Sequence, residues 1–423
     1  MSSCVAGIGD RTVVLYELDQ PHAVDGEFPT PPTIPMLLND LIGQIESGIA
    51  TLRRDLHAHP ELAFNENRTA DVVAAHLEKL GLEVFRGMAR TGVVARLKVG
   101  SGKRAIGLRA DMDALPLPEL NTFDHRSQHA GRMHACGHDG HTAMLLGAAE
   151  ALAATRNFDG TVYFIFQPAE EHQGGGKVMI EEGLFTRFPM ESVFGLHNWP
   201  GMAAGNIAVM EGPVMAGADT FEITITGRGG HAAMPHQAAD VVVAGSALVQ
   251  ALQMLVSRNT DPLDSAVISV TRFNAGFADN VLPEHAVLGG TVRSFNTTLQ
   301  DALEAGLHRV CDGIGETYGV TVALQYERGY PPTINAVEPA LVCREVARAV
   351  VGEARVYTDL KPSMGAEDFA YMAQAVPACY VWLGNGPGEG GCLLHSPHYD
   401  FNDAVIPVGI RYWVGIAERV LSR

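Results

Sequence analysis

A stretch of eight residues carries the side chains with the clearest chemistry. Residues 134–141, His-Ala-Cys-Gly-His-Asp-Gly-His, contain three histidines, one cysteine and one aspartate. Thiolate, imidazole and carboxylate are the ligands that zinc and similar metals prefer, and the glycines let neighbouring side chains converge. Cys136 and His138 are two residues apart, so in an extended segment both point the same way. The stretch predicts a metal site, and the alternative is a histidine-rich surface loop beside a buried cysteine.

A second group of reactive side chains, Glu170 and Glu171, directly follows an apolar run over 161–167. Two adjacent carboxylates at such a position are costly to desolvate unless a cation neutralises them. We therefore expect one glutamate to bind metal and the other to take a proton from water that the metal activates. The alternative is a solvated acidic turn.

Other polar side chains also follow predicted strands. Asp113 comes just after the strand over 105–110, and His197 follows the strand over 192–196. Sites in open α/β sheets lie outside the carboxyl ends of the strands, which favours a shared site. Asp113 could orient a ligating histidine or cap a turn. A cysteine nucleophile with a histidine base is a rival for Cys136, but it lacks an orienting third group.

The apolar pattern predicts the elements that position these side chains. Apolar residues recur every three or four positions from Leu37 to Leu56, as in an amphipathic helix. The nearly continuous apolar run over 161–167 is typical of a strand covered on both faces. The first part of the chain is predicted to form helices over 37 to about 59, 68–80 and 140–153, and strands over 82–85, 93–97, 105–110, 161–167 and 192–196.

Near Gly212-Pro213 the order of predicted helices and strands changes. A strand–helix–strand–strand–helix–strand order follows, as in the ferredoxin-like split motif. Its predicted elements are 220–226, 238–255, 266–273, 286–295, 298–318 and 320–326. After Pro331-Pro332 the first pattern resumes, with helices at 339–351, from Met364 and at 404–421, and a strand at 378–383.

These elements predict an α/β protein with two domains. A catalytic α/β domain with a mixed, mostly parallel sheet is interrupted by an inserted ferredoxin-like α+β domain. The predicted boundaries are an N-terminal extension over 1–36, the catalytic domain over 37–214 and 327–423, and the inserted domain over 215–326.

Composition narrows the possible partners. The chain has 423 residues, 47% of them hydrophobic, and a net charge of −18. This negative charge argues against nucleic acid and anionic membrane surfaces as binding partners, because both bind basic patches on proteins. We expect no apolar helix near the roughly 18 residues that span a membrane. The six cysteines include no CxxC pair, and no secretory signal is expected, so a cytoplasmic location is predicted.

Taken together, seven motifs resemble one family, the aminoacylase/carboxypeptidase-type dinuclear metallohydrolases. The similarity is strongest to the branch of hippurate hydrolases and auxin-conjugate amidohydrolases, and it covers about residues 37 to 423. The motifs are DMDALP (111–116), HACGHDGH (134–141), QPAEE (167–171), GLH (195–197), GGHAAMPH (229–236), NVLP (280–283) and MGAEDF (364–369).

The resemblance implies two divalent metal ions, Zn²⁺ or Mn²⁺, and a role for each matching residue. Cys136 is the bridging ligand, Glu170 the general base and Asp113 a carboxylate behind the ligands. The wider family has a ligand histidine where this chain has Asp111, and His138 takes over that duty in this branch. The remaining ligands implied by the resemblance are His138, Glu171, His197 and His395.

The resemblance also implies that the protein is a homodimer and that the inserted domain serves as its lid and dimerisation domain. His231 helps to polarise the scissile carbonyl, usually in the active site of the partner subunit. Asn280 and Arg293 match positions that hold the substrate carboxylate, a task that suits a bidentate arginine.

The implied activity is metal-dependent cleavage of N-acyl amino acids, such as hippurate, to a carboxylic acid and a free amino acid. The alternatives are an N-carbamoyl-amino-acid or dipeptide hydrolase on the same scaffold, and a catalytically silent small-molecule binding protein.

Overall fold

A computed structural model describes residues 36–387 and 392–423. The N-terminal extension predicted over 1–36 therefore lies almost entirely outside the described residues.

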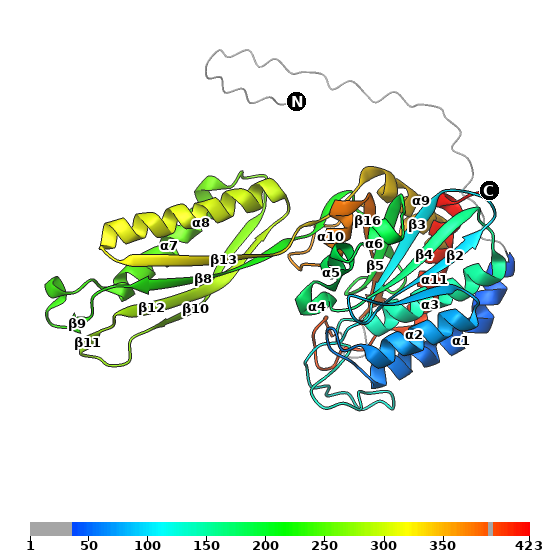
Figure 1. Ribbon diagram of the computed structural model, residues 1–423, viewed down its shortest axis with the longest axis horizontal. Coiled ribbons are helices and arrows are strands. Elements are labelled where there is room, and N and C mark those ends of the chain that lie inside the picture. Colours follow the sequence, from blue (N-terminus) through cyan, green and yellow to red (C-terminus); the bar gives the residue numbers. More distant parts are fainter. Residues whose placement is uncertain (1–35, 388–391) are drawn as a thin grey trace, which may run out of the picture. The chain divides into compact units, whose positions relative to one another are not determined.

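The larger sheet is mixed, with strand order β1-β2-β4-β3-β5-β16-β6-β15 (Figure 1). Its central pairs β4/β3, β3/β5 and β5/β16 are parallel, as is β6/β15, and the pairs β1/β2, β2/β4 and β16/β6 are antiparallel. This confirms the predicted mixed, mostly parallel sheet. The strands are β1 (Glu83–Met88), β2 (Gly92–Val99), β3 (Ala105–Asp111), β4 (Gly160–Gln167), β5 (Ser192–Pro200), β6 (Ile207–Ala208), β15 (Val356–Tyr357) and β16 (Ala378–Gly386).

Helices cover both faces of this sheet, because its central strands are apolar on both sides. In β4, Phe164 and Phe166 pack in one hydrophobic cluster, and Tyr163 and Ile165 pack in another. The first cluster contains residues of α1 (Met36–Ala58), α2 (Asn67–Lys79), α3 (His138–Thr155), α9 (Val337–Val351) and α11 (Ile406–Val420). The second contains residues of α5 (Gly175–Glu181), α6 (Leu184–Arg187) and α10 (Phe369–Ala375).

The smaller sheet is antiparallel, with strand order β10-β12-β8-β13 (Figure 1). This is the ferredoxin-like order for the predicted sequence of elements. Every second residue of the central strand β8 is buried, and the buried side of the sheet packs against two helices. The elements are β8 (Gly217–Thr226), α7 (Val241–Asn259), β10 (Ala266–Ala275), β12 (His285–Ser294), α8 (Thr297–Tyr318) and β13 (Thr321–Tyr330).

Several short elements complete the description. Two pairs of short strands form separate ladders, β7 (Gly212–Met215) with β14 (Thr333–Asn335) and β9 (Gly230–His231) with β11 (Val281–Leu282). The short helices are α4 (Glu170–Gln173), η1 (Pro235–Gln237), η2 (Glu353–Arg355) and η3 (Asp403–Val405). The boundaries that we predicted at 214/215 and 326/327 fall within β7 and β13.

Two sequence expectations about helices are wrong. The helix expected from Met364 begins at Phe369, and most of the residues from Met364 to Asp368 have no regular structure. The expectation of no membrane-length apolar helix fails for α7, which is 19 residues long and apolar enough by composition to span a membrane. Val241, Leu248 and Leu255 of α7 pack against the smaller sheet.

Candidate metal centre

Three parallel strands bring several acidic and imidazole side chains to one edge of the larger sheet. Neighbouring β3, β4 and β5 run parallel, and their carboxyl ends meet at the same edge. Asp111 ends β3, Glu170 begins α4 just after β4, and His197 lies in β5. We predicted that β5 would end before His197, but it continues to Pro200 because it stays paired with β16.

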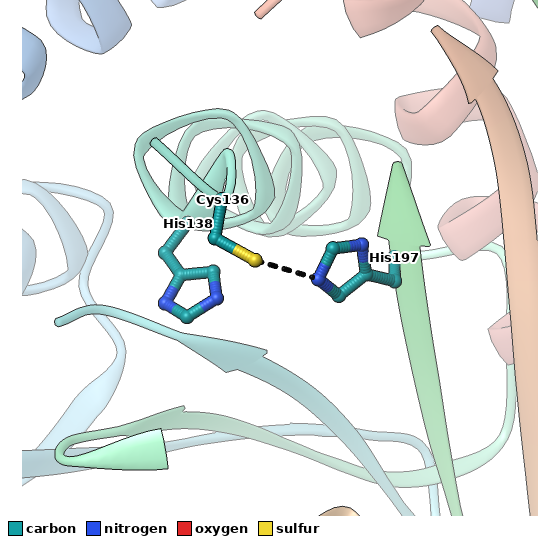
Figure 2. A group of neighbouring side chains, drawn as sticks. All are labelled: Cys136, His138 and His197. Carbon is teal, nitrogen blue, oxygen red and sulfur yellow. Dashed lines mark hydrogen bonds between the residues drawn. The ribbon is translucent and has the colours of Figure 1, made fainter. Parts of the chain in front are cut away.

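Cys136 and His138 converge because of the backbone at Gly137. Gly137 has a φ of +97°, in the left-handed region, and His138 is the first residue of α3. A Cβ at Gly137 would lie 2.2 Å from Asn198 Oδ1, so a side chain would not fit. The predicted extended segment is therefore wrong. Figure 2 shows the Cys136 thiol directed at His197, with 3.3 Å between Sγ and Nε2.

Glu171 links His138 to His395, a residue from much later in the chain. Its Oε1 atom lies 3.8 Å from His138 Nε2 and 3.4 Å from His395 Nε2. The turn that presents Glu171 begins at Ala169, whose φ of +56° lies in the left-handed region. His395 has a φ of +63°, and its N–H donates to the Ala135 carbonyl oxygen at 2.8 Å. Two strained backbone positions therefore hold this part of the cluster.

The five predicted ligands fall into overlapping groups that could hold metal ions. Two buried atoms, His138 Nε2 and Glu171 Oε1, have no hydrogen-bond partner among the described residues. Thiol, imidazole and carboxylate donors together suit zinc and other divalent transition metals. The ligand atoms lie within 4.8 Å of one another in each of the groups Cys136-His138-His197, Cys136-Glu171-His395 and His138-Glu170-Glu171. The residues present therefore fit divalent metals, and Cys136 belongs to two groups.

The electrostatics of the cluster favour cation binding. Burial lowers the pKa of His197 to about 3, so its imidazole is neutral and carries a lone pair on Nε2, which faces the Cys136 thiol. Burial opposes ionisation of Glu171, but its contacts with His395, His138 and Cys136 together outweigh burial and lower the Glu171 pKa to about 2. Burial and the two nearby glutamates raise the pKa of the Cys136 thiol well above its usual range. A bound cation would reverse this last effect, because positive charge favours the thiolate.

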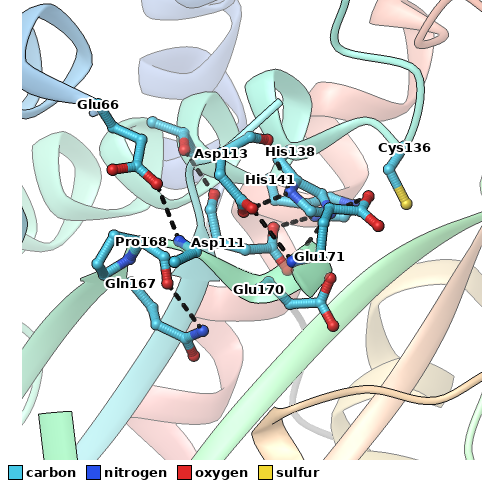
Figure 3. Close-up of polar contacts among 12 residues, drawn as sticks. Glu66, Asp111, Asp113, Cys136, His138, His141, Gln167, Pro168, Glu170 and Glu171 are labelled. Atoms are coloured by element: carbon cyan, nitrogen blue, oxygen red, sulfur yellow. Dashed lines mark hydrogen bonds and ion pairs between the residues drawn. The ribbon is translucent and has the colours of Figure 1, made fainter. Parts of the chain in front are cut away.

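Asp113 lies behind His138 and fixes the orientation of its imidazole (Figure 3). His138 Nδ1 is 2.9 Å from the Asp113 carbonyl oxygen and 3.2 Å from Asp113 Oδ1. Asp113 Oδ2 accepts a hydrogen bond from the Glu171 N–H at 3.1 Å. This is the arrangement expected of a carboxylate that orients a metal-ligating histidine. Asp111 contacts His141, with 2.6 Å between Oδ1 and Nδ1, and its Oδ2 lies 3.9 Å from His138 Nε2.

Glu170 is buried beside the ligands and is surrounded by other carboxylates. Its Oε1 accepts a hydrogen bond from the Asp368 N–H at 3.3 Å. Burial and then the charges of Glu367 and Glu171 raise the pKa of Glu170 well above its ordinary range. Arg109, which sequence reasoning missed, forms ion pairs with Glu367 and Asp368 at 2.9 and 3.0 Å. A carboxylate that holds a proton this readily is suited to proton transfer.

A cavity of about 620 Å³ lies against the cluster and contains several predicted site residues. Of these, Cys136, Glu170, Glu171, His197, Arg293 and His395 line it. Trp199 also lines the cavity and stacks on Trp382 with 3.9 Å between ring centroids. Tyr330 is another lining residue, and its hydroxyl donates to the Glu170 carbonyl oxygen and accepts from the Gly174 N–H. Sequence reasoning missed both aromatic residues, although Trp199 follows His197 at the two-residue spacing of one strand face.

His231 and Asn280 lie together elsewhere, in the segment over 217–330. His231 pairs with Val281 in the short β9/β11 ladder, and the Ala232 N–H donates to the Asn280 carbonyl oxygen at 3.1 Å. Both residues are exposed, and neither is among the described residues that line the cavity. The described part of one chain therefore does not bring them to the metal cluster.

Comparison with known proteins adds independent information. The sequence profile of peptidase family M20/M25/M40 matches residues 107–419. The chain is 40% identical to a hippurate hydrolase of Campylobacter jejuni over 389 residues, which is 92% of this chain and 99% of that protein. It is also 40% identical to an IAA-amino acid hydrolase of Arabidopsis thaliana, over 88% of this chain and 84% of that one.

Solved structures show the same relationship. A crystal structure of a dinuclear metal-binding peptidase of family M20 from Bacillus subtilis superposes with a TM-score of 0.79 and 33% sequence identity. The match covers 90% of this chain and 99% of the other.

Proposed function

The chain belongs to peptidase family M20/M25/M40 and is a hydrolase, and from this premise we propose that it cleaves the amide bond of N-acyl amino acids. The observation that carries the proposal is the position of Glu170, a buried proton-accepting group beside the ligand cluster in one cavity. Relatives named for hippurate and for IAA-amino acids support this substrate class. The products are a carboxylic acid and a free amino acid.

Two divalent ions, Zn²⁺ or Mn²⁺, would be held at this site by Cys136, which belongs to two of the ligand groups, and by four other side chains. These four ligands are His138, Glu171, His197 and His395. When bound, the ions supply Lewis acidity, which polarises a carbonyl group and lowers the pKa of water toward about 7. Asp113 holds His138 in the tautomer that leaves Nε2 free for a metal.

Glu170 is the proposed general base. It takes a proton from the attacking water, whose oxygen forms the new bond to the carbonyl carbon. As the C–N bond breaks, Glu170 passes this proton to the leaving amine. The hydrogen bond from Tyr330 to the Glu170 carbonyl oxygen keeps the backbone of the base in place during both transfers.

Arg293 is proposed to bind the carboxylate of the substrate's amino-acid part. Asn280, which lies beside His231, is proposed to reach the same carboxylate from a second copy of the chain. Arg293 lines the cavity, and burial lowers its pKa, so a carboxylate partner would relieve the cost of its burial.

The proposed assembly is a cytoplasmic homodimer formed through the segment over 217–330. In one chain the exposed His231 lies outside the cavity lining, which supports delivery of this imidazole from a second copy. There it would donate a hydrogen bond to the oxygen that becomes negative in the transition state.

A substrate screen tests the activity. After reconstitution with Zn²⁺ or Mn²⁺, the enzyme should release glycine from N-benzoylglycine, and metal analysis of the same sample should give two ions per chain. Faster turnover of N-carbamoylglycine or glycylglycine would reassign the substrate class. Binding of N-benzoylglycine without turnover by the metal-loaded protein would indicate a silent binding protein.

Replacing the base separates proton transfer from metal binding. Glu170→Gln should lower kcat by roughly two or more orders of magnitude, because the amide accepts no proton, and should keep the metal content. Steady-state kinetics and metal analysis on one preparation check this prediction. Turnover near the wild-type rate would exclude Glu170 as the base.

Replacing the imidazole tests whether the site is shared. His231→Ala should impair turnover without metal loss. A heterodimer of His231→Ala and Glu170→Gln subunits, isolated by two affinity tags, should recover about half of the wild-type activity, because one of its two symmetric sites is intact. An inactive heterodimer would place His231 and Glu170 of one chain in the same site.

A further inference from the structure

Glu66 is a buried carboxylate outside the metal cluster, at the residue that precedes α2. It does not cap α2 with its side chain. Its Oε1 accepts hydrogen bonds from the Phe64 N–H at 3.0 Å and from the Ala169 N–H at 2.9 Å. Its Oε2 accepts one from the Thr91 hydroxyl at 2.6 Å. Figure 3 shows Glu66 reaching toward the Pro168–Glu171 turn from the side away from Cys136.

The Ala169 contact joins Glu66 to the turn that presents the proposed base and a proposed ligand. Ala169 is fully buried and has a φ of +56°, a conformation that costs an L-residue with a Cβ about 1 kcal/mol or more. The next two residues are Glu170 and Glu171. On the other side of the turn, the Ala169 carbonyl oxygen accepts a hydrogen bond from the Gly175 N–H at 3.0 Å. The strained residue is thus held at both of its peptide groups.

Burial of Glu66 is costly, so its contacts need an explanation. Burial raises the pKa of Glu66 to about 7, and the charge of Asp113 adds to this effect. A charged group in such surroundings destabilises the fold, and an apolar residue of similar size would avoid the penalty. The three donors that Glu66 accepts from belong to three separate segments, at residues 64, 91 and 169.

We propose that Glu66 is a positioning residue, which keeps Ala169 in the left-handed conformation and thereby aims Glu170 and Glu171 at the reacting groups. For the kinetic part, this inference rests on the proposed function. The competing explanation is a purely structural role, in which Glu66 only ties the start of α2 to the loop at Thr91.

The two explanations differ in what a change at position 169 should do. Glycine adopts positive φ without the Cβ penalty, so Ala169→Gly reaches the required conformation without help from Glu66. If Glu66 acts through Ala169, the Ala169→Gly substitution should restore part of the kcat that is lost when Glu66 is replaced. If Glu66 only anchors α2, the two substitutions should be independent.

The experiment uses the metal-loaded full-length enzyme and N-benzoylglycine. Glu66→Leu removes both acceptor oxygens and with them all three hydrogen bonds. Glu66→Gln keeps an acceptor for Ala169 and Phe64, because Thr91 can accept from the amide. Thr91→Val is the matched control that removes one contact of Glu66 and spares Ala169. Near-UV circular dichroism selects folded samples, and Glu66→Ala, which lets water pair with the freed donors, replaces Glu66→Leu if that variant does not fold.

Glu66→Leu should lower kcat about 10- to 100-fold, with KM changed less than about threefold, as expected when reacting groups are misplaced. Glu66→Gln and Thr91→Val should stay within about threefold of wild type. The double variant Glu66→Leu/Ala169→Gly should have a kcat about tenfold higher than that of Glu66→Leu. Wild-type kcat for Glu66→Leu, or no recovery in the double variant, would overturn the proposal.

Metal affinity supplies a readout that does not depend on turnover. Glu171, a proposed metal ligand, lies two residues after Ala169, so a change at Ala169 should also move this ligand. Glu66→Leu should therefore weaken Zn²⁺ binding, measured in competition with a chelator, and the added Ala169→Gly substitution should restore it. If wild type hydrolyses no N-acyl amino acid, the proposed function fails, and this titration alone decides the role of Glu66. Unchanged Zn²⁺ affinity in folded Glu66→Leu would overturn that role.

Discussion

At the scale of single residues, the molecule buries many more charges than a core usually contains. Arg109 is fully buried and contacts Asp111 at 2.7 Å as well as Glu367 and Asp368. Such groups are tolerated only when they are paired or bind a cation. His138 Nε2 and Glu171 Oε1 are among the buried atoms that make no hydrogen bond within the described residues, and both belong to the proposed ligand set.

The raised pKa of Glu66 predicts a pH effect on stability. Its pKa is about 7 in the fold and 4.5 ordinarily, so between these values the folded chain keeps a proton that the unfolded chain has released. Stability therefore falls as pH rises through this window, by on the order of 3 kcal/mol. Glu66→Gln has no such proton and should gain stability relative to wild type from pH 5 to pH 8.

Urea unfolding of both proteins at several pH values, at one fixed metal concentration, checks this prediction. The difference in unfolding free energy should rise with pH and level off above about pH 7. A difference that stays constant across the range would show that Glu66 does not hold its proton in the fold.

Which residues could be predicted from the sequence depends on how local their signal is. Cys136, His138 and Glu171 stand in short runs of ligand types or directly after a strand, so their chemistry is visible in the sequence. Glu66 and Arg109 act through partners about 100 and 258 positions away, and neither has a local signature. Their roles depend on contacts that only the folded chain makes.

At the scale of elements, the start of α3 is the part on which the cluster depends most. Gly137→Ala should abolish metal binding, because its Cβ would collide with Asn198 Oδ1 and displace both Cys136 and His138. Gly131→Ala is the matched control: its φ of +75° is also left-handed, but its Cβ would meet nothing within 4 Å.

Metal analysis and thermal unfolding of the two variants test this prediction. Gly131→Ala should cost about 1 kcal/mol of stability and keep its metal. Equal metal content in both variants would show that the tight fit at Gly137 does not position the ligands.

Element prediction worked where burial leaves a pattern in the sequence. The run that forms β4 is buried along its whole length, and the alternation that forms β8 reflects one buried face. The two-residue strands β6 and β15 have no such pattern, since β6 exists only because it pairs with β16 and β15 only because it pairs with β6. The conformation at Gly137 was also not predicted. The two-residue spacing of Cys136 and His138 suggests an extended segment only if the backbone between them is regular, and the positive φ of Gly137 breaks that regularity.

At the scale of the whole molecule, α7 exposes apolar side chains that a second copy could cover. Val243 is 52% exposed and Met254 is 44% exposed, although both belong to a helix that packs on a sheet. Val243→Asp should convert the proposed dimer into a monomer, because the charge would be buried in the interface. An aspartate in the first turn does not weaken the helix itself.

Analytical ultracentrifugation measures the outcome, with Val337→Asp as the control. Val337 is 58% exposed and also lies in the first turn of a helix, α9, outside the inserted segment. The Val337→Asp protein should stay dimeric. If Val243→Asp is dimeric as well, the interface does not use this face of α7.

The hydrogen bond from Tyr330 to the Glu170 carbonyl oxygen has a practical consequence for protein engineering. Tyr330 is the last residue of β13, so the strand that closes the inserted segment also touches the backbone of the proposed base. A chimera that exchanges this segment for that of a relative should therefore place its junction before Tyr330. The Pro331-Pro332 pair is the junction that the sequence suggests. A junction there would replace Tyr330 and with it the contact to the Glu170 carbonyl oxygen.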